Sequence, residues 1–251
     1  GARQLGWIDD NKNFPGEIAQ ERKAVIVTGP PASGKSTIAN KIAQKNKAAI
    51  FDSDEAKKVF PEYEGGIGAN AVHEESGDLM SLALERALEQ GDNIVLPKVG
   101  DKTGSIEKTM ELFKLAGYEI QLVHMYVQED EAFRRMIARF ISTGRLIPPE
   151  YMRIVGENPQ TVYNQLKGKA DAYGEIDNTS PKDAPKEITD ASATNPFEGV
   201  DIRFREVGRA SSGESLATVP RQDGGAEQTL TEITDAGEQM LMEGVEAITG
   251  A

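Results

Sequence analysis

The sequence predicts an α/β fold in which a mainly parallel sheet of about five strands is flanked by helices. Three observations lead to this prediction. Short apolar runs rich in β-branched residues alternate with segments of helical spacing. A glycine-rich turn separates the first of these strands from the first helix. The connections between successive strands have lengths that suit right-handed crossovers, as in parallel sheets.

The elements are expected in a regular order. Strands are expected at residues 24–28, 48–51, 93–96 and 118–127, and helices at 36–44, 79–88, 104–116, 130–143 and 158–171. The second and third of these helices stop before Gly91 and Gly117, residues that suit a helix C-terminus. Ligands of such sheets bind beyond the carboxyl ends of the strands, where residues 33–36, 52–54 and 97–102 are polar.

The composition divides the chain into three parts. Residues 1–23 are expected to form an N-terminal arm, residues 24–178 the α/β domain, and residues 179–251 an acidic C-terminal extension. Residues 178–196 contain three prolines among polar residues, which is typical of a linker. A lone strand is expected at 200–207. Residues 229–248 predict an amphipathic helix, and a solvated acidic tail is the alternative.

Composition and charge exclude several classes of function. The chain has no cysteine and two histidines, so disulfides, thiolate metal sites and a typical zinc site are not expected. The net charge of −13 opposes binding to nucleic acid. We find no apolar run long enough for a membrane span and no secretion signal, so we expect a cytoplasmic protein or part of a larger polypeptide.

Residues 29–36 read Gly-Pro-Pro-Ala-Ser-Gly-Lys-Ser and match the phosphate-binding pattern G-x-x-x-x-G-K-S. A strand before the motif and a helix after it provide the context that the pattern requires. The lysine is expected to reach the β- and γ-phosphates, and Ser36 to ligate Mg²⁺. ATP or GTP and Mg²⁺ are therefore the expected cofactors. The residues predicted to bind the nucleotide are Gly29, Pro30, Pro31, Ala32, Ser33, Gly34, Lys35, Ser36 and Thr37.

Two aspartates follow the second predicted strand. Asp52 and Asp54 lie on the same side of an extended segment, so their spacing leaves open which of them orients or deprotonates an acceptor hydroxyl. The alternative is that Asp52 or Asp54 has only a structural role, as a helix cap or a turn residue.

The densest basic cluster contains Arg134, Arg135, Arg139 and Arg145. Arginine suits multidentate phosphate contacts, so this cluster predicts a lid that closes over ATP. A solvated helix face is the alternative, above all for Arg134. Of the two histidines, His73 is either an exposed polar residue or a proton relay, whereas His124 lies within a strand and is expected to be packed in the core.

The order of these motifs resembles the zeta-toxin family of P-loop kinases, over about residues 22–178. The resemblance rests on the phosphate loop, Phe-Asp-Ser-Asp, Val-His-Glu-Glu-Ser, and Ala-Arg-Phe-Ile-Ser-Thr-Gly-Arg-Leu-Ile-Pro. It implies a fold related to chloramphenicol phosphotransferase and phosphorylation of the 3′-hydroxyl of the amino sugar in UDP-N-acetylglucosamine. It places the catalytic base at Asp54 and the phosphate-binding arginines at Arg139 and Arg145, beside Lys35.

The chain departs from the family where the resemblance places the acceptor. After the third strand the family has an acidic residue, but this sequence has Pro97, followed by Lys98 and Lys102 as alternative positive contacts. A related branch phosphorylates the adenosine ribose of NAD, so the acceptor stays open between these metabolites. The residues predicted to bind the acceptor are Asp52, His73, Glu75, Ser76, Lys98 and Lys102.

Two other classes of function share parts of this pattern. A polynucleotide 5′-hydroxyl kinase would have the same loop and lid, but the acidic charge counts against it. A nucleotide-dependent switch would need an apolar run ending in Asp or Asp-Glu at the Walker B position, which the sequence does not show. The resemblance also implies a neutralising antitoxin that obstructs the ATP site. The alternative to such a partner is control in cis by residues 227–246.

Overall fold

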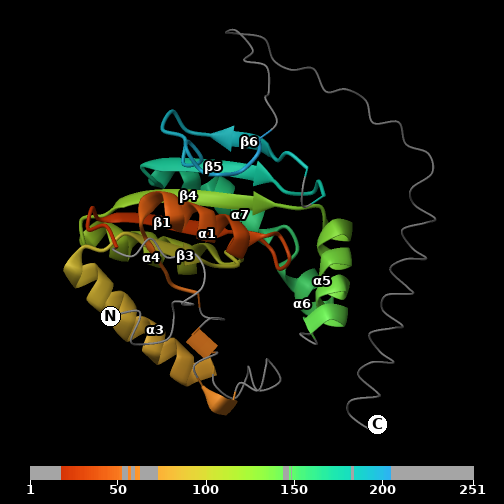
Figure 1. The fold of residues 1–251 in the computed structure, drawn as a ribbon, viewed down its shortest axis with the longest axis horizontal. Helices are drawn as coiled ribbons and strands as arrows, with labels where there is room; N and C mark the ends of the chain where they lie inside the picture. Colours follow the sequence, from red (N-terminus) through yellow and green to blue (C-terminus); the bar gives the residue numbers. More distant parts are fainter. Residues whose placement is uncertain are drawn as a thin grey trace, which may run out of the picture. The chain divides into compact units, whose positions relative to one another are not determined.

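The computed structural model describes residues 18–52, 56–57, 60–62, 73–143, 147, 149–181 and 184–204, all within one compact unit that spans Gly1–Arg205. They form an α/β fold around a six-stranded sheet with the order β2-β3-β1-β4-β5-β6 (Figure 1). The first five strands in chain order are parallel, and β6 pairs with β5 in the antiparallel sense. The strands are β1 (Lys23–Thr28), β2 (Ala49–Ile50), β3 (Ile94–Pro97), β4 (Glu119–Tyr126), β5 (Ala172–Asp177) and β6 (Glu187–Ala191).

Helices cover both faces of the sheet, so its central strands are apolar on both sides. On one face, Val25 and Val27 of β1 pack against Ile38 and Ile42 of α1. On the other face, helices α3, α4 and α7 meet the alternate residues of β1, β3 and β4. The helices are α1 (Lys35–Asn46), α3 (His73–Gln90), α4 (Thr103–Leu115), α5 (Glu129–Thr143), α6 (Pro149–Val155) and α7 (Asn158–Leu166).

Helix α7 and the strand after it differ from the sequence prediction. A helix was expected through residue 171, but α7 ends at Leu166, a 3₁₀ turn follows, and β5 begins at Ala172. The Asp171 carboxylate accepts a hydrogen bond from the Ile120 amide (2.8 Å) beside the start of this strand. The buried positions of β5 are Ala172, Gly174 and Ile176, and two of these three residues are too small to produce a hydrophobic pattern.

The interpretation of residues 178–196 as a linker is wrong. Strand β6 lies within this segment and extends the sheet beyond β5. Phe197 follows it, is only 2% exposed, and belongs to the same core cluster as Ile38 and Ile42. The lone strand expected at 200–207 is reduced to one bridge between Lys186 and Phe204, and residues 205–251, including the predicted C-terminal helix, lie outside the described residues.

Candidate active site

The phosphate loop connects β1 to α1 and is held in a conformation that requires glycine at residue 34. Gly34 has φ +90°, and a Cβ atom there would lie 2.4 Å from Nδ2 of Asn178. The same Nδ2 atom donates a hydrogen bond to the Ser33 carbonyl (2.8 Å). Helix α1 begins at Lys35, so its first amides are available to an anion at the loop.

Lys35 spans the phosphate loop from one end to the other. Its Nζ atom donates hydrogen bonds to the carbonyls of Gly29 (2.8 Å) and Pro30 (2.7 Å). Ser36 and Thr37 are exposed at the start of α1, whereas the Ser33 hydroxyl is buried and lacks a hydrogen-bond partner among the described residues. The loop therefore presents an ammonium group, two hydroxyls and helix-terminal amides, which is the set that a triphosphate needs.

One cavity of about 950 Å³ joins the phosphate loop to three other parts of the fold. These are the end of β2 with Asp52, the segment from β3 to α4, and two arginines of α5. Among the predicted site residues that line this cavity are Pro31, Ala32, Gly34, Lys35, Ser36, Thr37, Asp52, Lys98, Lys102 and Arg139. The structure therefore brings these predicted residues to one cavity, and their roles stay predictions.

Other predicted site residues cannot be placed in this cavity. Asp54 and Arg145 lie outside the described residues, as do the side chains of His73 and Glu75. Ser76 is described and is buried in the first turn of α3, but it is not one of the cavity's lining residues.

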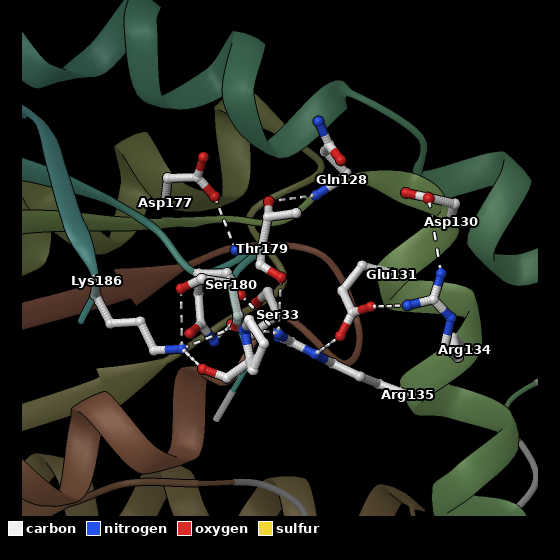
Figure 2. A network of polar contacts seen from close by, with 12 residues as sticks. Ser33, Gln128, Asp130, Glu131, Arg134, Arg135, Asp177, Thr179, Ser180 and Lys186 are labelled. Carbon is white, nitrogen blue, oxygen red and sulfur yellow. Dashed lines mark hydrogen bonds and ion pairs between the residues drawn. The ribbon is translucent and has the colours of Figure 1, made fainter. Parts of the chain in front are cut away.

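A polar network connects α5 to the phosphate loop (Figure 2). Arg135 donates from Nε to the Glu131 carboxylate (2.8 Å) and from Nη2 to the carbonyls of Asn178 (2.7 Å) and Ser180 (3.1 Å). The Asn178 side chain in turn binds the Ser33 carbonyl. Arg135 is partly buried and acts as a clamp between the helix and the end of β5, a role that the sequence analysis did not foresee.

The neighbouring arginines differ from Arg135 in their surroundings. Arg134 is exposed and pairs with Glu131 (2.6 Å) and Asp130 (4.0 Å) on its own helix, which matches a solvated helix face. Arg139 lies one turn beyond Arg135 and lines the large cavity. Arg135 and Arg139 thus both line the cavity, whereas Arg134 forms ion pairs at the surface of α5.

His124 lies in β4 behind the phosphate loop and is 1% exposed. Its Nδ1 atom is 3.0 Å from the Thr28 hydroxyl, and its ring stacks on Tyr163 at 5.3 Å. Burial, and to a smaller extent the charge of Lys35, lower the pKa of His124 to about 3. His124 is therefore a neutral core residue, as its position within a strand predicted.

The segment after β3 is fixed against the phosphate loop by its backbone. The Lys98 amide donates to the Val27 carbonyl (2.9 Å), and the Gly29 amide donates to the Val99 carbonyl (3.1 Å). Burial lowers the pKa of the Lys98 ammonium, which faces the large cavity. The phosphate loop and the segment after β3, which both line the cavity, are thus joined by backbone hydrogen bonds where β1 and β3 end.

A second cavity of about 470 Å³ lies beside the first turns of α1. It shares Gly34 and Thr37 with the large cavity, and its other walls include Asn178, Lys186 and Arg203. The last three residues follow β5. The sequence analysis missed this cavity because it treated that part of the chain as a linker.

Comparison with protein families identifies the fold and the chemistry. The sequence profile of the family described as Zeta toxin matches residues 7–178. This chain belongs to the zeta toxin family. As a zeta toxin family protein it is an ATP-binding P-loop kinase, a phosphotransferase that acts on a hydroxyl group of a small molecule.

Individual relatives agree with this assignment. The chain is 34% identical over 152 residues to a shikimate kinase of Rhodococcus jostii (strain RHA1), a match that covers 59% of the chain and 79% of the relative. The fold is also similar to a structure of the PezAT chromosomal toxin–antitoxin system of Streptococcus pneumoniae. In that match the TM-score is 0.59 and the identity 18%, with 96% of this chain and 93% of the other chain covered.

The fold is also similar to the crystal structure of AvrRxo1-ORF1:-ORF2 with ATP. The TM-score is 0.54 and the identity 17%, and the match covers 84% of this chain and 73% of that chain. Within the described part of this zeta toxin family chain, no helix has the length and apolar character that crossing a membrane requires.

Proposed function

We propose that this zeta toxin family kinase transfers the γ-phosphate of ATP or GTP to a hydroxyl of a small nucleotide-type metabolite. UDP-N-acetylglucosamine or a related nucleotide sugar is the leading acceptor. The supporting observation is the cavity of about 950 Å³, because the phosphate loop and the segment after β3 both line it. Donor and acceptor would therefore meet within one cavity, as phosphoryl transfer requires.

The donor is proposed to bind along the start of α1. Its phosphates would lie at the phosphate loop, where Lys35 and the amides of α1 offset their charge. The nucleotide's base would enter the second cavity, which is adjacent because Gly34 and Thr37 line both cavities. Asn178 and Lys186 would then provide polar contacts beside the base.

Mg²⁺ is proposed to bind between the Ser36 hydroxyl and the phosphates of the donor. The residues present fit such an ion, because Ser36 and Asp52 bring oxygen ligands to the same cavity. Bound there, Mg²⁺ would neutralise part of the charge on the β- and γ-phosphate oxygens.

The remaining roles follow the family resemblance. Asp54 is proposed to orient the acceptor hydroxyl and to accept its proton, with Asp52 as the nearby carboxylate that lines the cavity. The amide of Phe51 bonds to the Val95 carbonyl (2.9 Å), which fixes the chain just before these aspartates. Arg139 and Arg145 are proposed to offset charge on the transferred group.

A test of this proposal combines the purified protein and ATP with a panel of acceptors. The panel contains UDP-N-acetylglucosamine, NAD, shikimate and a 5′-hydroxyl oligonucleotide, and mass spectrometry follows the gain of one phosphate, about 80 Da. We expect a product with UDP-N-acetylglucosamine or a related nucleotide sugar. ATP hydrolysis that is independent of every acceptor would instead indicate a nucleotide-dependent switch.

Two substitutions test the proposed roles of Lys35 in phosphate binding and of Asp54 as the catalytic base. Lys35→Ala and Asp54→Asn should each lower the rate of transfer by at least about 100-fold, since they remove phosphate binding and proton acceptance. Lys108→Ala, on the exposed side of α4, serves as the control. Full turnover by Asp54→Asn would remove Asp54 from the mechanism.

The kinase is also proposed to act with a neutralising partner. The solved relative from Streptococcus pneumoniae comes from a toxin–antitoxin system, which supports this expectation. The partner would obstruct the donor site. Co-expression of the neighbouring open reading frames with this chain should relieve growth inhibition, and a lack of growth inhibition by the kinase alone would contradict the proposal.

A further inference from the structure

Thr28, the last residue of β1, lies directly before the phosphate loop and is completely buried. Its neighbour Gly29 begins the loop at φ +148°, where a Cβ atom would lie 2.6 Å from the Met125 carbonyl oxygen. Because the backbone has so little room here, a small shift of Thr28 would change the conformation at the start of the loop. Thr28 is therefore a point at which the loop can be held in place from within the core.

The Thr28 side chain contacts two neighbouring parts of the fold. On β4, its hydroxyl oxygen lies 3.1 Å from the Val123 carbonyl oxygen and 3.0 Å from Nδ1 of His124. On the segment after β3, Gly100 has φ +78°, and a Cβ atom there would lie 2.8 Å from the Thr28 methyl carbon. Thr28 thus lies between β4 and the segment after β3, at the entrance to the phosphate loop.

The two polar contacts of the Thr28 hydroxyl indicate which ring nitrogen of His124 carries a hydrogen. A hydroxyl has one hydrogen, and here it is donated to the Val123 carbonyl. The contact with Nδ1 is then a hydrogen bond only if Nδ1 carries a hydrogen and donates it to the threonine oxygen. Burial keeps the ring neutral by lowering the pKa of His124, so the ring has one N–H group in all. The two distances therefore indicate the Nδ1–H tautomer.

Other side chains fix the orientation of the imidazole. The ring stacks on that of Tyr163 in α7, with the ring centroids 5.3 Å apart and an angle of 23° between the planes. The Tyr163 hydroxyl donates a hydrogen bond to the Asp190 carboxylate of β6 (3.1 Å), which also pairs with the Lys167 ammonium (2.6 Å). The imidazole is thus held by α7 directly and by β6 through Tyr163.

We propose that His124 is a positioning residue of the kinase, whose Nδ1–H group holds the Thr28 hydroxyl and thereby sets the start of the phosphate loop for the donor's phosphates. The inference rests on the proposed function, because that loop is the proposed donor site. His124 does not line the large cavity, so it acts through Thr28 and takes no part in proton transfer. Loss of the bond would let the start of the loop shift, and a loop that is less well preorganised binds a triphosphate more weakly.

Nitrogen-15 NMR of the whole chain tests the tautomer without any need for turnover. A long-range proton–nitrogen correlation spectrum distinguishes the two tautomers of a neutral histidine. The chain has two histidines, so the spectrum of His73→Gln assigns the remaining signals to His124. We expect the protonated nitrogen to be Nδ1, and a ring protonated at Nε2 would overturn the proposal.

Two substitutions of His124 separate the hydrogen bond from packing. Asparagine places its amide nitrogen near the former Nδ1, whereas glutamine places it near the former Nε2. Both remove the ring that stacks on Tyr163, and asparagine leaves the larger space, so His124→Asn should melt at least as low as His124→Gln. Affinity for a non-hydrolysable ATP analogue with Mg²⁺ should show the opposite order. In calorimetric titrations His124→Gln should weaken binding roughly tenfold, and His124→Asn should stay within about threefold of the wild type.

A substitution of Thr28 tests the same bond from its other end. Thr28→Val keeps a β-branched side chain against Gly100 but removes the hydroxyl, so it should weaken binding of the ATP analogue as much as His124→Gln does. The two substitutions combined should weaken binding no further, because each removes the same hydrogen bond. Phe113→Leu, a substitution of a buried core residue of α4, is the control for lost packing. It should lower the melting temperature and leave the affinity unchanged.

Failure of this inference and failure of the proposed function give different results. The inference is overturned if affinity for the ATP analogue follows the melting temperature across the variants, or if the effects of Thr28→Val and His124→Gln add. The proposed function fails if the wild-type chain binds the analogue but phosphorylates no acceptor with ATP, and in that case the dependence of binding on His124 would remain. A wild-type chain that does not bind the analogue at all would overturn both.

Discussion

His124 illustrates how a single buried residue behind the phosphate loop affects the whole fold. Its ring is removed from water, contacts Thr28 and stacks on Tyr163. Because the folded protein holds its pKa at about 3, the imidazole stays neutral under conditions in which an unfolded chain would protonate it. The histidine therefore links the stability of the core, directly behind Lys35, to pH.

The pH dependence of stability tests this interpretation. A histidine whose folded pKa is lowered binds more protons when unfolded, so stability is full above about pH 6.5 and falls as the pH drops towards 3. Each pH unit in that window should cost up to about 1.4 kcal/mol. Urea unfolding of the wild type and of His124→Gln between pH 4.5 and 7 should show a shallower slope for the variant. His73→Gln is the control, and equal slopes would contradict the assignment.

At the scale of elements, the contact between α5 and the end of β5 determines the shape of the donor side. Arg135 donates hydrogen bonds to the carbonyls of Asn178 and Ser180, and the Asn178 side chain donates one to the Ser33 carbonyl of the phosphate loop. The loop is thus stabilised by a residue 145 positions further along the chain. A movement of α5 should therefore change the position of the phosphate loop and the binding of the donor's phosphates.

Adjacent arginines provide a test of this clamp. Arg135→Met should raise the KM for ATP by about tenfold, because it removes charge-assisted hydrogen bonds to the segment that supports the loop. Arg134→Met removes the ion pairs of an exposed arginine with Glu131 and Asp130 on the same helix and should change the KM by less than about twofold. Steady-state kinetics with ATP as the varied substrate measures both. Equal effects of the two substitutions on the KM for ATP would show that the loss of positive charge on α5, and not the loss of the Arg135 hydrogen bonds, changes ATP binding.

The sequence predicted those elements that carry a strong periodic pattern. The apolar run at β1 and the spacing of Ile38 and Ile42 were enough to place the phosphate loop between a strand and a helix. Strand β5 was missed because alanine and glycine fill buried positions that usually carry large side chains. Asn178 was missed for a different reason: a single asparagine after a strand has no pattern, and its function arises from a long-range contact.

At the scale of the whole molecule, the folded unit extends past the end of the family match at residue 178. Strand β6 and Phe197 belong to the same sheet and core as the phosphate loop. The Lys41 ammonium of α1 donates a hydrogen bond to the backbone carbonyl of Asp201 (2.5 Å). This bond further connects the segment after β6 to the helix that follows the phosphate loop. The last strand and the residues after it thus complete the domain.

Truncations at two points test where the domain ends. A chain that stops at residue 178 should lose its cooperative thermal unfolding or melt at least about 10 °C lower, since it lacks β6 and Phe197. A chain that stops at residue 205 should melt within about 2 °C of the whole chain, because the compact unit ends there. Differential scanning calorimetry distinguishes the two. Equal melting temperatures for the chain that stops at residue 178 and the whole chain would show that β6 adds no stability.

The backbone bonds that fix residues 98 and 99 have a consequence for how this scaffold diversifies. They involve only main-chain atoms, so the side chain at position 98 can be exchanged while β1, β3 and the phosphate loop keep their positions. Lys98 is predicted to contact the acceptor, so recognition of the acceptor would then be separable from the backbone that holds the donor. Exchange of that one side chain would be expected to change the acceptor while the phosphate loop keeps its conformation.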